Sequence, residues 1–370
     1  MRKLFMIVCA ALVFVACGDK QEQSKEVTQE VEKQEQEQKQ CELKVFGANP
    51  ALTVMLEILY PQGLIGLNYK PYPEDIPFMP EGTAELPILG HTGKNLNFEE
   101  IASLKPDVIF FADNTLDSVI EPYAKIGIEA VKVPLFSYEE SKNTIEAITQ
   151  SLSKNEACSE LIKPRGERLL DFLAQSNELL HNAQHALESN EAQEAHSTQE
   201  QLENAEQDSH SVRPSIYFAQ GFDGLKTQCS ASEDKKDLAY QIGGVNAISC
   251  DMISTEQQTQ VDFELLAKVN PQVIFVREIP LFKELLENPN EKWQALNALQ
   301  NKKVFYAPST PSNWLMRPPS IMQSVGLVWA YSKIHPELIS DEVAKTHAQK
   351  FYEIFLEPLS DEEYYRLQGL

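Results

Sequence analysis

Two similar stretches, 165 residues apart, combine a helical pattern with a continuous apolar run. Residues 98–111 read FEEIASLKPDVIFF and residues 263–276 read FELLAKVNPQVIFV, and seven of the fourteen positions are identical. In each copy a proline ends a short amphipathic helix, and an apolar run without alternation follows. Such a run is typical of a parallel strand that is covered on both faces. The repeat predicts two similar α/β lobes, although two unrelated helix–strand segments can share this pattern.

The rest of the hydrophobic pattern agrees with this arrangement. Further strands are expected at 43–46, 64–67, 88–90, 129–133 and 215–219, with helices between them. Strands that alternate with helices favour a parallel sheet covered on both faces. From residue 138 to residue 180, apolar positions recur at helical spacing, which predicts a long helix joining the lobes. An interruption of this helix before Pro164 is an alternative.

The N-terminal residues indicate export. Arg2 and Lys3 precede an apolar run that is too short to span a bilayer comfortably, and Ala16-Cys17-Gly18 follows it. Cysteine directly after a small residue resembles a bacterial lipobox, so residues 1–16 are predicted to be a lipoprotein signal peptide and Cys17 the lipidated residue. An ordinary cleaved signal or an uncleaved anchor is the alternative. Residues 17–42 are almost entirely polar and are predicted to form a flexible tether.

The charge and composition of the remaining chain restrict its partners and indicate its segments. The formal net charge of −23 argues against nucleic acid as a partner and against electrostatic binding to anionic lipid. Residues 43–137 are expected to form the N-terminal lobe, 138–180 the helical linker, 181–212 an acidic insertion containing histidines, and 213–370 the C-terminal lobe. His181 and His185 lie four positions apart, which suits one helix face and a transition metal such as nickel, copper or zinc. A solvated insertion of low complexity is the alternative.

Four cysteines remain after Cys9 and Cys17 are set aside. Cys229 and Cys250 flank one expected helix and are the predicted disulfide, with Cys41 and Cys158 as the default second pair. Export permits disulfides, but free buried thiols remain an alternative. The spacing does not match a zinc site, which normally uses close cysteine pairs.

Several segments resemble one family. IYFAQGFDGLKTQ (216–228), LAYQIGGVNAI (238–248) and NWLMRPPSIMQSVGLVWAYSKIHPEL (313–338) resemble the C-terminal lobe of periplasmic binding proteins for iron–siderophores, cobalamin and related metal chelates. GANPALTVMLEILYPQGLIGLN (47–68) and ILGHTGKNLNFEEIASLKPDVIFF (88–111) resemble the first lobe of the same family. The resemblance implies an α/β fold in which two similar parallel-sheet lobes are joined by a long interdomain helix, with the ligand cleft between the lobes.

The cleft of such a fold lies at the carboxyl ends of the strands. The residues expected to bind ligand there are Asn49, Tyr69, Asp113, Phe222, Arg277, Trp314 and Arg317. A flat indole at Trp314 and a bidentate donor at Arg317 suit a planar or anionic chelate, whereas packing of Trp314 and capping by Arg317 are the alternatives. Arg277 either reaches the cleft or pairs with Glu278.

The resemblance also implies how the protein meets its transporter. In relatives, one surface glutamate on each lobe docks onto arginines of the membrane permease, and Glu99 and Glu264 match these two by position. Their equivalence in the two repeats suits a permease with two-fold symmetry. The alternative is that both carboxylates only stabilise helix N-termini.

The implied function is that of the substrate-binding component of an ABC importer for a metal chelate, most simply an iron complex. A nickel- or cobalamin-binding member of the family is one alternative, and a non-transport lipoprotein scaffold is another. No enzyme motif such as H-E-x-x-H, G-x-S-x-G or a P-loop is present in the sequence, so no catalytic activity is expected. The expected protein is a monomer that is lipid-anchored on the periplasmic side of a bacterial membrane. It carries no intrinsic cofactor, and its partners are the permease, the ATPase and the bound chelate.

Overall fold

The computed structural model describes residues 41–73, 75–90, 96–134, 137–201, 213–230, 235–253 and 260–370, with only the backbone described for 193–201. The predicted signal peptide, the lipidated Cys17, nearly all of the tether and residues 202–212 of the insertion lie outside the described residues. Among the described residues, no helix combines the length and the apolar character that crossing a membrane requires.

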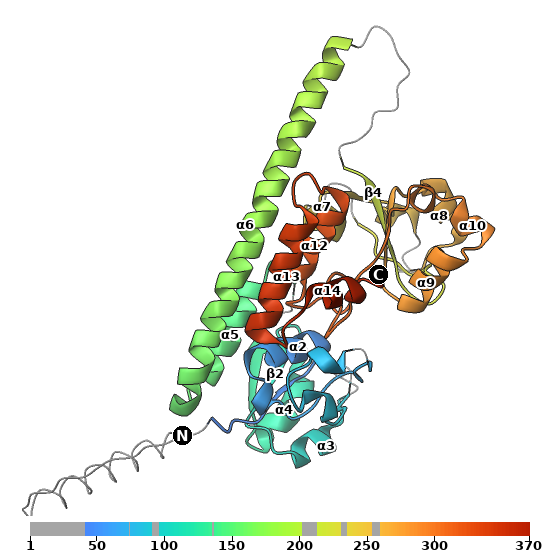
Figure 1. Cartoon of the computed structure of the whole chain (residues 1–370). Helices are drawn as coiled ribbons and strands as arrows, with labels where there is room; N and C mark the ends of the chain where they lie inside the picture. The colour runs from blue at the N-terminus through green and yellow to red at the C-terminus, as the bar shows by residue number, and fades with distance from the viewer. Residues whose placement is uncertain are drawn as a thin grey trace, which may run out of the picture. The chain divides into compact units, whose positions relative to one another are not determined.

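The first lobe is built on a parallel sheet that its apolar segments dictate (Figure 1). Within the described residues this sheet has three strands in the order β1–β2–β3. The strands are β1 (Val45–Gly47), β2 (Val108–Ala112) and β3 (Glu129–Val133). Every residue of β1 and β2 is buried, as expected of strands with helices on both faces. The expected strands at 64–67 and 88–90 form only isolated bridges, such as the one that joins Leu67 to Ile88.

Helices surround this sheet. They are α2 (Pro50–Leu59), α3 (Phe98–Ser103) and α4 (Asp117–Lys125), with 3-10 turns at Pro61–Gly63, Ile76–Phe78 and Thr83–Glu85. Phe46, Ile101, Ile109 and Phe111 form the centre of a core between the sheet and these helices, and all four are fully buried. The first lobe therefore has its own apolar interior.

The second lobe contains a separate parallel sheet, whose order in the described part of the chain is β5–β4–β6–β7. Its strands are β4 (Ser215–Ala219), β5 (Val245–Asn246), β6 (Val273–Val276) and β7 (Val304–Tyr306). Its helices are α7 (Leu238–Gln241), α8 (Phe263–Val269), α9 (Ile279–Glu287), α10 (Glu291–Gln294) and α11 (Asn297–Gln300), and a 3-10 turn spans Cys250–Met252. Cys229 and Cys250 form a disulfide with an S–S distance of 1.99 Å, and Cys41 and Cys158 each take part in a disulfide bond.

The two repeated stretches form equivalent units. In the first, α3 leads into β2, and in the second, α8 leads into β6. Both helices begin with a side-chain cap: Asn97 accepts a hydrogen bond from the backbone of Glu100, and Asp262 accepts one from Leu265. The sequence repeat is therefore a structural repeat, and the prediction of two parallel-sheet lobes is confirmed.

The helical linker is interrupted before Pro164, as the sequence allowed, but it is longer than predicted. The break lies between α5 (Ser141–Leu152) and α6 (Glu156–Gln201), and α6 runs on through Pro164. A single proline inside a long helix removes one backbone hydrogen bond, which the packing of the other turns can offset. α6 also continues beyond residue 180, because Ala183 and Leu187 still face the apolar interior and are buried.

Contacts along α6 reach both lobes (Figure 1). Arg165 donates to the backbone carbonyl of Ile58 in α2 of the first lobe. Further along, the Gln184 amide donates to the carbonyl of Tyr240 in α7 at 2.6 Å. α6 therefore joins the lobes physically. Three C-terminal helices complete the chain, namely α12 (Gln323–Ile334), α13 (Asp341–Phe355) and α14 (Asp361–Leu367), and α12 packs on both α6 and α13.

Candidate ligand-binding site

The predicted ligand residues follow the carboxyl ends of strands or of strand-like segments, but their side chains have different environments. In the first lobe, Asn49 caps α2, since its Oδ1 accepts a hydrogen bond from the backbone of Leu52 at 3.0 Å. Asp113 directly follows β2 and is exposed. Asn49 therefore stabilises the N-terminus of α2. The carboxylate of Asp113, by contrast, is exposed at the edge of the sheet.

Tyr69 is partly buried, and its side chain is held by a hydrogen bond to a buried carboxyl group. Its hydroxyl donates to the carboxyl group of Glu57, with distances of 3.0 and 2.9 Å to the two oxygens. Glu57 lies on α2 and has no exposed surface. Burial raises the pKa of Glu57 to about 8, the Tyr69 hydrogen bond opposes this rise, and the negative charge of Asp75 adds to it. Sequence reasoning missed Glu57, although a lone carboxylate in the apolar run PALTVMLEIL is the signal that could have found it.

Phe222 follows β4 and is 81% exposed. It lies in a tight turn that is closed by two backbone hydrogen bonds between Gln220 and Lys226, at 2.8 and 3.0 Å. Gly221 and Gly224 in this turn have φ angles of +79° and +70°, which glycine adopts without a steric penalty. The turn holds an aromatic ring in solvent at the end of a strand, as a ligand-stacking residue requires.

Arg277, at the end of β6, contacts Arg317 in the loop between β7 and α12. Arg277 directly follows β6, and its Nε donates to the backbone carbonyl of Arg317 at 3.1 Å. Its Nη1 pairs with Oε1 of Glu278 at 2.7 Å, so Arg277 makes the salt bridge that the sequence left as an alternative. Arg317 is exposed and makes no side-chain hydrogen bond or ion pair with the rest of the described chain. Of the two arginines, Arg317 is therefore the one whose positive charge is accessible to a ligand.

Trp314 requires a correction. The sequence predicted that its indole ring stacks on a ligand, but the side chain is fully buried. Its Nε1 donates to the carbonyl of Thr310 at 3.0 Å and to the hydroxyl of Tyr352 at 3.2 Å, and the ring contacts Trp329 edge-on. Because the indole ring is covered by other side chains and its N–H is hydrogen-bonded, Trp314 has no exposed face on which a ligand can stack. Trp314 is a packing residue.

The predicted metal residues both lie on α6. His181 and His185 are exposed and four positions apart on one continuous helix. Among the described residues, no group of three or more histidine, cysteine, aspartate or glutamate side chains is placed to hold a metal ion. The two histidines therefore supply two protein ligands at most within that part of the chain.

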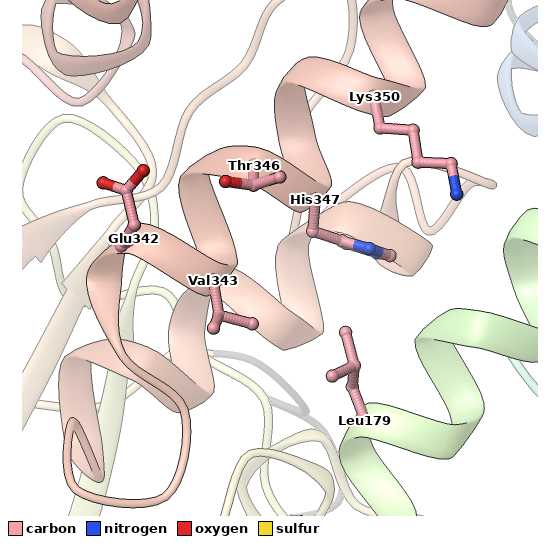
Figure 2. Close-up of a pocket in the computed structure, with 6 residues that line it drawn as sticks. All are labelled: Leu179, Glu342, Val343, Thr346, His347 and Lys350. Carbon is pink, nitrogen blue, oxygen red and sulfur yellow. The ribbon is translucent and has the colours of Figure 1, made fainter.

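A pocket of about 290 Å³ lies between α6 and α13 (Figure 2). Leu179 comes from α6, and the remaining lining residues, which include Val343 and His347, come from α13. Burial lowers the pKa of His347 to about 4, and the ring bonds to the carbonyl of Ser324 at 3.0 Å. The pocket contains none of the residues predicted to bind ligand, and its histidine is neutral and engaged in packing.

These observations define a class: a two-lobed α/β binding protein whose accessible aromatic and cationic residues follow the ends of parallel strands. The chain belongs to the periplasmic binding protein family, whose model matches residues 74–311. Members of this family are the substrate-binding proteins of ABC transporters and work in the periplasm. The family serves transport rather than catalysis.

Solved structures of similar proteins share the fold. An ABC transporter solute binding protein from Sulfurospirillum deleyianum DSM 6946 has a TM-score of 0.67 and 27% identity, covering 88% of this chain and 94% of its own. The heme-binding protein RhuT from Roseiflexus sp. RS-1 has a TM-score of 0.52 and 17% identity, covering 80% and 99%. The vitamin B12 binding protein BtuF of Vibrio cholerae has a TM-score of 0.50 and 16% identity, covering 82% and 97%. No curated protein sequence matches the chain.

Proposed function

We propose that this protein captures a metal chelate, specifically an iron complex, between its two lobes and delivers it to an ABC permease. The observation that carries the proposal is the combination of exposed Phe222 and exposed Arg317 in the loops that follow β4 and β7 of the second lobe. An aromatic ring can stack on a planar or apolar ligand, and a guanidinium can bind carboxylate or phenolate oxygens in a bidentate manner. Such chemistry suits an organic chelator that carries a partial negative charge.

Two further observations narrow the proposed cargo. Asp113 places an exposed carboxylate at the sheet edge of the first lobe, which disfavours a chelate with a high negative charge, such as a tricatecholate. Proteins of the same fold bind heme and vitamin B12, both of which are large metal chelates. A cobalamin or a nickel chelate is the alternative cargo for the same site.

The proposal also includes the lipid anchor at Cys17. The mature protein would then be held at the outer face of the inner membrane or at another periplasmic membrane surface, near its permease. Mass spectrometry of the protein extracted from membranes tests this point, since a diacylated cysteine at position 17 adds a defined mass. An unmodified N-terminus that begins after residue 17 would contradict the anchor.

Cargo is identified by native mass spectrometry and metal analysis of the full-length protein purified in mild detergent. We expect one chelate per chain, with iron as its metal. Titration with a ferric monocatecholate complex, heme and cobalamin, followed by tryptophan fluorescence, then ranks the ligand classes. Stoichiometric cobalt or nickel in the purified protein would replace iron as the cargo, and binding of none of the probes would contradict the function.

Arg317→Gln should weaken binding of an anionic chelate by about tenfold, or about 1.4 kcal/mol. Glutamine keeps much of the length and polarity of the side chain but loses the charge and the bidentate geometry. Isothermal titration of both proteins with the chelate identified above measures the loss. Arg366→Gln is the matched control, because Arg366 is an exposed arginine on α14. Equal weakening in both variants, or in neither, would remove Arg317 from the site.

The histidine pair supports a second, auxiliary proposal. Because His181 and His185 are exposed at positions i and i+4 of α6, we expect the full-length protein to bind Ni²⁺ or Zn²⁺ through both rings. His181→Ala and His185→Ala should each lower this metal affinity at least tenfold, whereas Asn182→Ala on the neighbouring face should leave it unchanged. Titration with the metal salts measures the effect. Unchanged affinity in both histidine variants would make the pair part of a solvated helix surface.

A further inference from the structure

One buried contact connects the two lobes close to the proposed site. Asp75 belongs to the proline-rich segment 69–86 of the first lobe and is 5% exposed. Its Oδ1 accepts a hydrogen bond from the hydroxyl of Thr310, 235 positions later, at 2.8 Å. In the same segment, Phe78 contacts the ring of Tyr352 edge-on, with 6.0 Å between the ring centroids. The segment is thus attached to the second lobe by a polar and an aromatic contact.

Thr310 is fixed on its second-lobe side as well. Its carbonyl oxygen accepts hydrogen bonds from the indole of Trp314, at 3.0 Å, and from the hydroxyl of Tyr352. α12 packs directly on this loop, because a Cβ atom at Gly326 would lie 1.8 Å from the carbonyl oxygen of Trp314. Arg317 follows three residues after Trp314. Thr310 therefore helps to fix the position of the loop that carries Arg317.

Asp75 is connected in the opposite direction to the first-lobe part of the proposed site. Tyr69 begins the same segment and is anchored through its hydroxyl to the fully buried Glu57 on α2. Oδ2 of Asp75 accepts a hydrogen bond from the backbone of Tyr72 at 3.3 Å, which ties the carboxylate to the start of the segment. Movement of Asp75 relative to α2 would therefore disturb Tyr69.

We propose that Asp75 and Thr310 are positioning residues, which we call the interlobe clasp, and that their hydrogen bond fixes the orientation of one lobe relative to the other. The clasp holds in register the segment that carries Tyr69 and the loop that carries Arg317. Its effect on ligand binding rests on the function proposed above, whereas its effect on lobe orientation does not. Neither clasp residue is exposed enough to serve as a ligand residue itself.

The distance between the lobes tests the clasp without any ligand. Ketone-bearing amino acids at Ser103 on α3 and Lys268 on α8 of the full chain accept nitroxide labels and leave the disulfides intact. Both positions are exposed. We expect double electron–electron resonance to give one narrow distance distribution in the parent protein. Thr310→Val should broaden or shift it, because valine keeps the shape of threonine and loses the hydroxyl donor.

Matched variants make the result specific. Thr310→Ser keeps the hydroxyl and should restore the parent distribution, and Thr346→Val on the exposed surface of α13 should not alter it. Circular dichroism confirms that each variant is folded, and Asp75→Asn provides a second, conservative disruption. Identical distributions for the parent, Thr310→Val and Asp75→Asn would overturn the clasp. Failure of every chelate probe to bind the parent protein would overturn the proposed function and leave the distance result to decide the clasp.

Discussion

Replacing Glu57 with glutamine should stabilise this protein by about 4 kcal/mol at pH 7.5 and have almost no effect at pH 4. Burial raises the pKa of Glu57 to about 8, from 4.5 for the free side chain. The folded protein therefore keeps a proton that the unfolded chain releases above pH 4.5. Stability is lost as the pH rises between these two values, by about 1.4 kcal/mol per pH unit for this one group.

Glutamine removes this dependence because it is a neutral side chain of nearly the same shape, and its carbonyl oxygen can still accept the Tyr69 hydroxyl. The titratable groups that act on Glu57 are Tyr69, whose hydrogen bond lowers its pKa, and Asp75, whose negative charge raises it. Tyr69 itself remains protonated throughout this range, since burial and Glu57 hold its pKa well above its ordinary value. The difference in the free energy of unfolding between the variant and the parent protein therefore measures the ionisation of Glu57.

Urea unfolding between pH 4 and pH 9 measures the effect. We expect the two stability curves to coincide at low pH and to separate steadily up to about pH 8. Glu81→Gln is the control, since Glu81 is exposed and its substitution should change the free energy of unfolding by less than about 0.5 kcal/mol at every pH. Parallel curves for Glu57→Gln and the parent protein would show that Glu57 is ionised in the folded state.

Charge reversal of Glu99 and Glu264 together should abolish uptake of the cargo and leave its affinity unchanged. Both carboxylates are exposed, both lie in the first turn of the repeated helix, and neither makes an ion pair or a side-chain hydrogen bond with another described residue. Lysine at either position costs the folded protein only about 0.3–1 kcal/mol through the helix dipole. At a permease surface that carries arginines, the same change replaces attraction with repulsion at two contacts.

The measurement is accumulation of radiolabelled chelate in cells whose single copy of the gene carries Glu99→Lys and Glu264→Lys. Titration of the purified variant with the chelate then confirms that capture is intact. Glu81→Lys with Glu287→Lys is the matched control, because it adds the same charge at exposed positions outside the repeated helices. Normal uptake by the Glu99 and Glu264 variant would restrict both residues to helix stabilisation.

The sequence predicted which loops carry the candidate site residues, but not which of their side chains are exposed. Phe222 and Arg317 were found because they lie in the loops that follow apolar strands, and the structure leaves both side chains exposed. Trp314 satisfies the same sequence criterion and is fully buried. The criterion fixes where a residue lies along the chain, but the packing of α12 and α13 against the loop decides which way a side chain points. Arg277 illustrates the same limit, because its pairing with Glu278 depends on local geometry.

The sequence by itself determined the two parallel-sheet lobes, the repeated helix–strand unit and the joining helix, because each depends on local periodicity and on residues close together in the chain. Only the tertiary structure showed that this helix continues past residue 180, where Ala183 and Leu187 are buried. The tertiary structure also brought Asp75 to Thr310 and left Glu57 without solvent. Contacts across 235 positions arise from the packing of whole lobes, and no local pattern encodes them.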